Sequence, residues 1–213
     1  MSVLGLLPIG GSDIPLEILS IMTTAYQTSL PIHTPATASA KGVPLLEGAK
    51  KSLGFVPNMY GAMVNSPGLL ETYQLGYERF RSDSGFTPAE QEVVFLTLSF
   101  DNGCDYCMAA HSFLADNMSK VSKDVTEAIR SGRAIPDEKL AALSAFTRHL
   151  LQSRGRPTAT EAQAFFAAGY SEPLVFDLIL AIAVKTLSNF SNHISSTPVD
   201  EVFKGRLWTA PVG

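Results

Sequence analysis

The stretch from Glu92 to His111, EVVFLTLSFDNGCDYCMAAH, constrains the fold most, because it predicts two helices joined by a short break. Its first half is almost continuously apolar, as expected for a buried helix. Asp101, Asn102 and Gly103 then interrupt the run with residues that favour turns. Asp101 or Asn102 is expected to cap the second helix, since a short polar side chain accepts from a first-turn N–H. The chain must therefore bury a pair of linked helices.

The second helix of this pair carries both cysteines of the chain, Cys104 and Cys107, followed by His111. Their spacing of i, i+3 and i+7 places the three side chains on one helix face. Cys104 is expected in the first turn, where the helix dipole favours a thiolate. His111 lies one turn beyond Cys107 and is placed to accept its proton, while Glu92 from the preceding helix is placed to orient the histidine. Glu92 is also expected to stabilise the imidazolium that forms when the thiol ionises, so Glu92→Gln is predicted to raise the pKa of Cys107. This pattern indicates thiol chemistry.

The rest of the chain also shows helical periodicity, and no segment has the period-2 alternation of a half-buried strand. The fold class is therefore predicted to be all-α. Glycines and prolines mark the helix ends, and Thr160 is expected to cap one helix. Helices are expected over residues 45–53, 58–65, 68–81, 88–100, 104–117, 120–131, 136–154, 161–168 and 173–195.

The domain organisation follows from the turn-forming residues near the N-terminus. Residues 1–40 are rich in glycine and proline and are predicted to be a loosely ordered extension and linker. Met22 is a second candidate start, so residues 1–21 need not belong to the native protein. Residues 41–203 are predicted to form one all-α domain. Residues 204–213 form a tail whose Trp208 is expected to dock on its own or a neighbouring subunit.

One spacing occurs twice along the chain. Asp177, Asn189 and Asn192 are separated by the same intervals as the glutamate and the two cysteines, 85 residues later. Two related helical halves would explain this match, and so would chance agreement at three positions.

The composition restricts the partners and the compartment. The 213 residues are 46% hydrophobic and 17% charged with a net charge of −4, and no basic stripe indicates nucleic-acid binding. No apolar stretch is expected to be long enough to span a bilayer, and residues 1–9 lack the basic start of a signal peptide. Two cysteines three positions apart do not form a secreted disulfide framework, so the cytoplasm is the expected compartment.

The combined motif Glu-x11-Cys-x2-Cys-x3-His resembles the active site of AhpD-type alkylhydroperoxidases, within the carboxymuconolactone decarboxylase family. The surrounding segments resemble the peroxidase-related branch of that family over roughly residues 40–203. These segments are LGFVPNMY at 53–60, SPGLLETY at 66–73, TPAEQEVV at 87–94, NGCDYCMAAH at 102–111 and KTLSNFSNH at 185–193.

The resemblance implies a thiol peroxidase with an all-α, AhpD-like fold that assembles as trimers or hexamers and uses no cofactor or metal. It implies that Cys107 attacks the hydroperoxide, that Cys104 resolves the product, and that His111 and Glu92 relay protons. Tyr106 stands where the best-known members have a second histidine between the cysteines. Nothing in the chain supplies electrons, so a dithiol protein is the expected reductant.

Several alternatives stay open at this point. Tyr106 is expected to be a pocket wall, and Glu90 to serve the N-terminal end of its helix. Asn189, Asn192 and His193 either surround the cysteine site or cap a helix end or meet another subunit. The cysteines are alternatively buried structural thiols, the switch of a redox-sensing adaptor, or, with the histidine and glutamate, the ligands of a metal-binding helical module.

Overall fold

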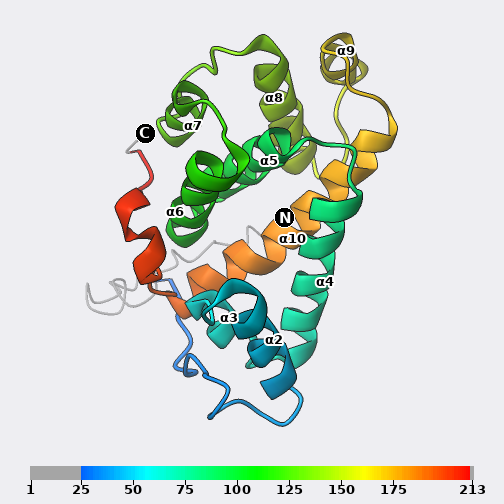
Figure 1. Ribbon diagram of the computed structural model, residues 1–213. Helices are drawn as coiled ribbons and strands as arrows, with labels where there is room; N and C mark the ends of the chain where they lie inside the picture. The colour runs from blue at the N-terminus through cyan, green and yellow to red at the C-terminus, as the bar shows by residue number, and fades with distance from the viewer. Residues whose placement is uncertain (1–24, 212–213) are drawn as a thin grey trace, which may run out of the picture.

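The computed structural model describes residues 25–211, and its regular elements in that range are all helices (Figure 1). Helix α5 (Pro88–Asp101) is the centre of the molecule, with every residue from 90 to 99 buried. It contacts α6 (Asp105–Leu114), α7 (Lys123–Arg130), α8 (Glu138–Gln152) and α10 (Pro173–Ser195). The predicted all-α class is confirmed.

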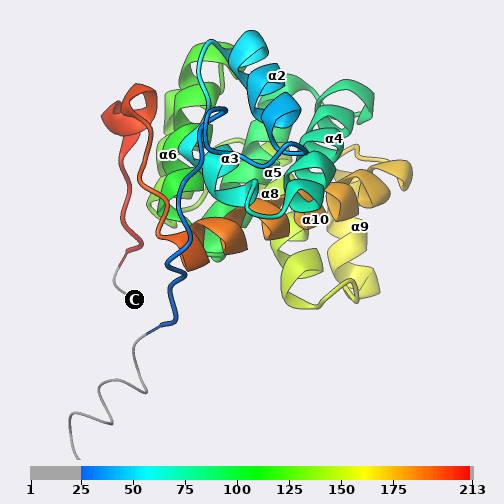
Figure 2. The ribbon, with the colours of Figure 1, turned by 90° about the horizontal axis from the view of Figure 1, so that it is seen from below.

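The other helices surround this centre. Helices α4 (Pro67–Asp83) and α10 pack side by side, and α2 (Val43–Leu53) and α3 (Asn58–Met63) cover one end of them (Figures 1 and 2). At the opposite end, α9 (Ala159–Ala167) packs against α8. After α6 the chain makes a π-helical turn, η1 (Ala115–Ser119), and the 3-10 helix η2 (Glu201–Arg206) lies along α6.

The break between α5 and α6 is a helix C-cap built on one glycine. Gly103 has φ 64°, a left-handed conformation that glycine adopts without a steric penalty. Its N–H donates to the carbonyl of Phe100, and the N–H of Cys104 donates to that of Ser99, each at 2.9 Å. This is the Schellman pattern, which satisfies the last carbonyls of a helix and turns the chain away. As a result α6 runs back along α5.

The prediction that Asp101 or Asn102 caps α6 is therefore wrong. Cys104 is the N-cap residue, and no side chain within residues 25–211 caps this helix. Asn102 instead donates to Asn189 on α10 at 2.9 Å, and Asp101 pairs with Arg148 on α8. Both polar side chains are used for contacts between helices, which the sequence does not reveal.

Several other helix ends differ from the sequence prediction by one to three residues, among them the starts of α7 and α8 and both ends of α9. Thr158, not Thr160, caps α9, because it forms a reciprocal capping box with Glu161. Helix α6 ends at Leu114, before residue 117, and the wider π-helical turn follows. Glu90 serves the start of α5 as expected, in a capping box with Thr87.

The spacing match across 85 residues does not reflect matching local structure. Asp177, Asn189 and Asn192 lie on the single uninterrupted helix α10, whereas Glu92 and the cysteines lie on two helices. The equal intervals therefore span different backbone geometries.

The expectation that no apolar stretch is long enough to span a bilayer is wrong for helix α10. Among the described residues it is the one helix that passes by length and composition, with 23 residues and an 18-residue stretch whose mean hydropathy is 1.6. Yet it packs against α3, α4, α5, α6 and α8 and buries the polar side chains of Lys185, Asn189 and Asn192. These contacts make it a core helix of the domain.

The two ends of the described chain lie against this domain. In the segment 25–40, Thr28 donates its N–H to Ile194 at 2.9 Å and His33 donates to Gly61 at 2.8 Å. Trp208 in the C-terminal tail packs on Phe100 of the same chain and donates its indole N–H to a backbone carbonyl. Residues 1–24 lie outside the described range, so the boundary proposed at residue 40 stays a prediction.

Candidate active site

The paired helices bring Glu92 and His111 together. The imidazole Nδ1 lies 2.9 Å from one carboxylate oxygen of Glu92, and both side chains are buried. The other carboxylate oxygen accepts from Arg81 of α4. The ring of Phe95 packs on the imidazole with centroids 4.8 Å apart. A hydrogen bond from Nδ1–H to Glu92 leaves the Nε2 lone pair of His111 free to accept a proton.

The surrounding charges hold this pair as carboxylate and neutral imidazole. Burial would raise the pKa of Glu92, but His111 and Arg81 outweigh it and hold the pKa below its usual value. Burial and the charge of Lys185 lower the pKa of His111 despite the carboxylate beside it. The resting histidine is therefore a base near neutral pH.

The two cysteines lie under α10. Both thiols are free, and the residues are 0% and 2% exposed for Cys104 and Cys107. The side-chain amide of Asn192 lies 3.3 Å from the Cys107 sulfur and 3.8 Å from the Cys104 sulfur. The Ser188 hydroxyl is 4.0 Å from Cys107. The site is thus completed by one face of a helix about 85 residues further along the chain.

The two thiols differ in acidity, in the opposite sense to the helix-dipole expectation. The hydrogen bond with Cys107 raises the pKa of the Cys104 thiol, and burial adds to this. Burial would also raise the pKa of Cys107, but the hydrogen bond from Cys104 and the charge of Lys185 outweigh it, so this pKa lies well below the usual value. The arrangement favours a Cys107 thiolate that accepts from a Cys104 thiol.

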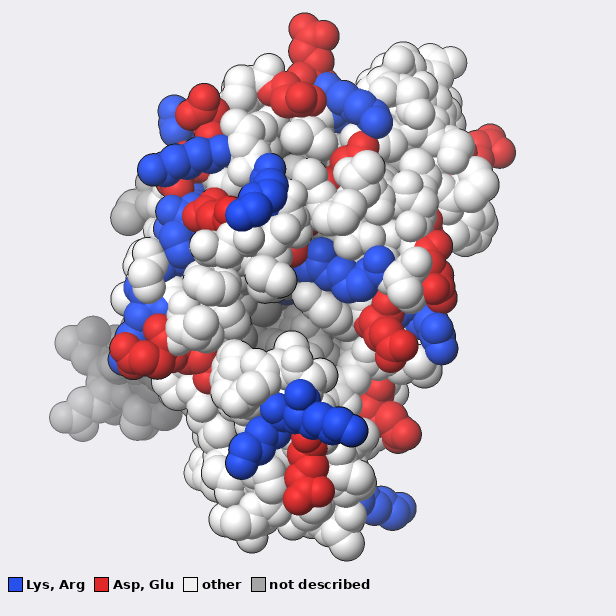
Figure 3. Space-filling model, in the orientation of Figure 1, with Lys and Arg blue, Asp and Glu red and all other residues white. Residues whose placement is uncertain are grey.

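An apolar pocket leads to Cys107 and His111. It has a volume of about 320 Å³, and its lining includes Tyr60, Tyr73 and Tyr77. Burial raises the pKa of each of these phenols, so they remain neutral. Figure 3 shows a central hollow with uncharged walls on a face where charges of both signs are interspersed. The walls of the pocket are thus a mixture of neutral aromatic and aliphatic side chains.

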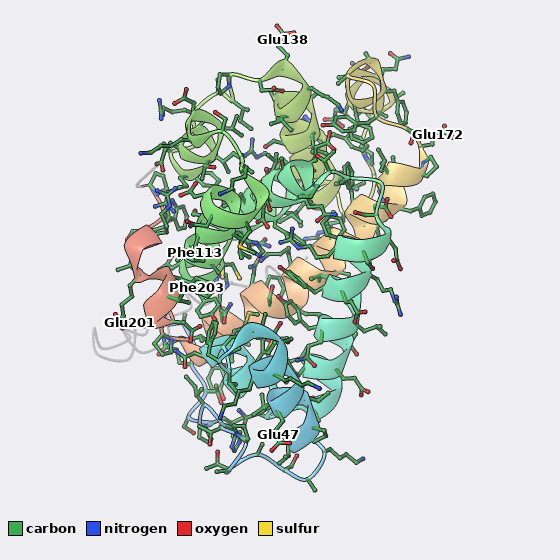
Figure 4. All side chains as sticks on the ribbon, in the orientation of Figure 1. Glu47, Phe113, Glu138, Glu172, Glu201 and Phe203 are labelled. Atoms are coloured by element: carbon green, nitrogen blue, oxygen red, sulfur yellow. The ribbon has the colours of Figure 1, made fainter. Side chains whose placement is uncertain are left out.

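Two further aromatic side chains stand at one edge of this pocket. Phe113 of α6 and Phe203 of η2 lie next to each other, with ring centroids 5.6 Å apart (Figure 4). They are drawn from segments about 90 residues apart, which η2 brings against α6.

Comparisons with known proteins agree with this architecture. A search of protein-family models and a search of curated proteins gave no match. Among solved structures, the AhpD core of a peroxidase-related protein from Ralstonia eutropha JMP134 matches with a TM-score of 0.72 and 18% identity. That match covers 84% of this chain and 97% of the other. A peroxidase-related protein from Silicibacter sp. TM1040 matches with a TM-score of 0.71 and 17% identity, over 85% and 95% of the two chains.

The chain has the AhpD-like fold. A third structure, the debrominase Bmp8 in complex with 2,3,4-tribromopyrrole, matches with a TM-score of 0.63 and 15% identity, over 84% of this chain and 96% of the other. At these identities the likeness concerns the fold, and the chemistry of this chain rests on its own residues.

Within the AhpD-like fold, a second and more polar cleft opens beside Cys104. It has a volume of about 310 Å³ and is lined by Gly103, Asp105, Asn192, Ser196 and neighbouring residues. Tyr106 lines this cleft as well as the apolar pocket, and its hydroxyl donates to Asp200. The tyrosine is thus a wall between the two openings.

The structure places the remaining predicted residues at different distances from the sulfurs. Asn192 contacts both thiols. Asn189 accepts from Asn102, a residue of the turn between α5 and α6. His193 is exposed and lines the polar cleft, apart from the Glu92–His111 pair.

Arg81 and Lys185 are not among the predicted site residues, although Lys185 acts on both the Cys107 thiol and His111, and Arg81 acts on the Glu92–His111 pair. For Lys185 the sequence carries a signal: it is a single cation in the apolar run LILAIAVKTL, four and seven residues before two asparagines. Arg81 of α4 donates to Gln91 and Glu92 of α5, which are 10 and 11 residues further along the chain. Only the packing of the two helices shows these contacts.

The alternative of a metal-binding module finds no geometric support in the described part of the chain. No group of three or more His, Cys, Asp or Glu side chains there is arranged to hold a metal ion. Both oxygens of Glu92 are already bound, one to Arg81 and one to His111. The arrangement is suited to thiol chemistry.

Proposed function

We propose that the protein is a thiol-dependent peroxidase that reduces hydroperoxides through the Cys104–Cys107 pair. The observation that carries this proposal is the acidified Cys107 thiol next to the neutral imidazole of His111, which the Glu92 carboxylate orients, at the end of an apolar pocket. A thiolate, an adjacent base and a second thiol are the groups that two-cysteine peroxide reduction needs. The AhpD-like fold supports the same reading.

In the first step, the Cys107 thiolate attacks the terminal oxygen of the hydroperoxide. The S–O bond forms as the O–O bond breaks, and sulfur is oxidised to a sulfenic acid. His111 takes up a proton at Nε2, from the Cys107 thiol or, where the thiol is already ionised, from solvent, and delivers it to the leaving oxygen, which departs as the alcohol or as water. Glu92 holds the imidazole in the tautomer that this transfer requires.

In the second step, the Cys104 thiol attacks the sulfenic sulfur. A disulfide forms and water leaves, so one hydroperoxide consumes two thiols. An external dithiol protein then reduces the disulfide by exchange. The polar cleft beside Cys104 is the side from which such a partner reaches this pair.

The apolar pocket suits an organic hydroperoxide better than hydrogen peroxide. Its aromatic walls favour burial of an alkyl or aryl group, and its neutral phenols supply hydrogen-bond donors for the peroxide oxygens. We also propose that the protein acts in the cytoplasm as a homo-oligomer, without a bound metal or cofactor.

Intact-mass analysis after one equivalent of cumene hydroperoxide tests the proposal. The wild type is expected to lose two hydrogens as the disulfide forms. Cys107→Ser is expected to abolish consumption, and Cys104→Ser to gain one oxygen, trapped as a sulfenic acid on Cys107. A sulfenic acid on Cys104 in the Cys107 variant would reverse the roles, and no reaction in the wild type would refute the peroxidase.

The aromatic pocket also favours a second candidate, reductive dehalogenation of an aromatic ring. The Cys107 thiolate would take the halogen from carbon, a proton would replace it, and Cys104 would displace halide to form the disulfide. One aryl halide and two thiols thus give arene, hydrogen halide and disulfide. Halide release from a bromopyrrole, with no response to hydroperoxides, would favour this activity.

Disulfide formation without turnover by a dithiol would favour a redox-sensing adaptor.

A further inference from the structure

Lys185 is a buried cation whose charge lacks a direct partner. It lies on α10 and is 1% exposed, and its Nζ has no hydrogen-bond partner among residues 25–211. Its Nζ is 5.5 Å from the centroid of the Phe95 ring, a contact that attracts the ammonium without neutralising it. A buried ammonium is strongly disfavoured unless an opposite charge lies nearby. The structure therefore needs an anion at this position.

Lys185 faces the cysteine site from α10. Lys185, Ser188 and Asn192 are spaced i, i+3 and i+7 and share one face of the helix. The last two contact the Cys107 sulfur, at 4.0 and 3.3 Å. Lys185 thus lies beside Phe95 on the face that contacts Cys107, near enough for its charge to lower the pKa of that thiol.

The other ionisable groups around Cys107 do not supply the missing negative charge. Glu92 is already paired with Arg81. The phenols of α3, α4 and α6 stay neutral because burial raises the pKa of each, and Cys104 stays a thiol. Asp200 accepts from Tyr106 and from a backbone N–H. The titratable and charged groups around this site, besides Lys185 and Cys107, are Tyr60, Tyr73, Tyr77, Arg81, Glu92, Cys104, Tyr106, His111 and Asp200.

We propose that Lys185 is the counter-ion of the Cys107 thiolate and that the reduced site rests as this ion pair. Cys107 loses its proton to solvent by way of His111, and the Cys104 thiol donates to the resulting anion. Disulfide formation removes the negative charge and leaves the ammonium unpaired, which favours reopening of the disulfide by the external dithiol. The inference deepens the proposed peroxidase but concerns the thiol in the absence of peroxide.

Titration of one thiol tests the ion pair directly. In a Cys104→Ser background, which keeps a hydroxyl donor, thiolate absorbance and iodoacetamide reactivity are followed against pH. Lys185→Met is expected to raise the midpoint by about one pH unit or more, the scale of one lost charge interaction. Lys185→Arg is expected to keep the low midpoint, and Lys123→Met, at an exposed site, to leave it unchanged. An unchanged midpoint in folded Lys185→Met overturns the proposal.

A reciprocal measurement covers the case in which Lys185→Met does not fold. Under reducing conditions, unfolding of the wild type and Cys107→Ser is compared across pH. The pKa of Cys107 is lowered in the fold, while an unfolded thiol titrates near about 8.5. Stability from the ion pair is therefore complete above the unfolded value and is lost as pH falls through the folded value. The advantage of the wild type must grow with pH in that window, and a constant difference overturns the proposal.

Both measurements omit peroxide, so the two proposals can fail separately. A protein that does not react with hydroperoxides but whose Cys107 titration midpoint depends on Lys185 would support the ion pair and refute the peroxidase. Peroxide turnover together with a titration midpoint that does not depend on Lys185 would support the peroxidase and overturn the ion pair.

Discussion

At the residue scale, Arg81 changes what Glu92 does for the histidine. The sequence predicts a buried carboxylate that stabilises an imidazolium, so that its loss would raise the pKa of Cys107. In the structure Arg81 already neutralises Glu92, and burial together with Lys185 lowers the pKa of His111. Loss of the Glu92 charge would leave the charge of Arg81 uncompensated, which stabilises the Cys107 thiolate. The structure therefore predicts that loss of the Glu92 charge lowers the pKa of Cys107, the opposite of the change predicted from the sequence.

Glu92→Gln is therefore expected to slow peroxide reduction by about tenfold or more at pH 7, because the histidine becomes a weaker base. The pKa of Cys107 is expected to fall or stay low. Peroxide turnover and thiol alkylation against pH are the measurements. Glu90→Gln is the matched control, since Glu90 serves the capping box and pairs with Lys139, away from the sulfurs. An alkylation midpoint that rises in Glu92→Gln would restore the sequence-based reading.

At the element scale, the turn between α5 and α6 sets the position of Cys104. Gly103→Ala places a side chain at φ 64°, which destabilises the fold by about 1–2 kcal/mol and shifts the start of α6. Gly169→Ala is a matched control with φ 92° at the end of α9, where Gly169 donates to Phe166 as Gly103 donates to Phe100.

Both variants are expected to melt at lower temperature, but Gly103→Ala alone is expected to slow alkylation and disulfide formation. Thermal melts and the rate of disulfide formation after peroxide addition measure these effects. Equal disulfide rates in the two folded variants would show that the turn does not position the cysteines.

The helices that hold the site were largely predictable from local sequence. Proline and glycine marked the helix ends, and the apolar run before the Asn102-Gly103 break predicted a helix pair that returns His111 to Glu92. Local sequence failed where packing decides. The sequence does not show the N-cap of α6, because Asn102 bonds to α10. It marks Lys185 as a single cation in an apolar run but does not show the anion that Lys185 faces, because Cys107 lies on another helix. Such long-range pairs have no local signal.

At the scale of the whole molecule, the segment 25–40 tests where the domain begins. A chain that starts at Met22 keeps the hydrogen bonds of Thr28 and His33 and is expected to melt within a few degrees of the full chain. A chain that starts at Lys41 loses them and is expected to lose about 2–3 kcal/mol. Thermal melts of the two truncations measure this. Equal melting would place the domain boundary at residue 40, as the sequence predicts.

The outer face of α10 carries large apolar side chains that a single chain leaves in water. Phe176 is 74% exposed, Phe190 54%, and Ile179 and Ile194 47% each. A contiguous apolar face of this kind is typical of a surface that another molecule covers. Since the AhpD-like resemblance implies a homo-oligomer, we expect a second copy of the chain to cover it.

Phe190→Asp is therefore expected to dissociate the oligomer, because a carboxylate in an apolar interface loses its hydration without a partner. Light scattering should give a multiple of 22.8 kDa for the wild type and a value near 22.8 kDa for the variant. Leu75→Asp is the matched control, since Leu75 is 53% exposed on α4. A wild type that remains at the mass of one chain at micromolar concentration, or a Phe190 variant that keeps the wild-type mass, would remove α10 as the interface. The thiol titration of Phe190→Asp is expected to match the wild type, because Lys185 lies on the buried inner face of α10, which packs on Cys107 of α6, and not on the exposed outer face.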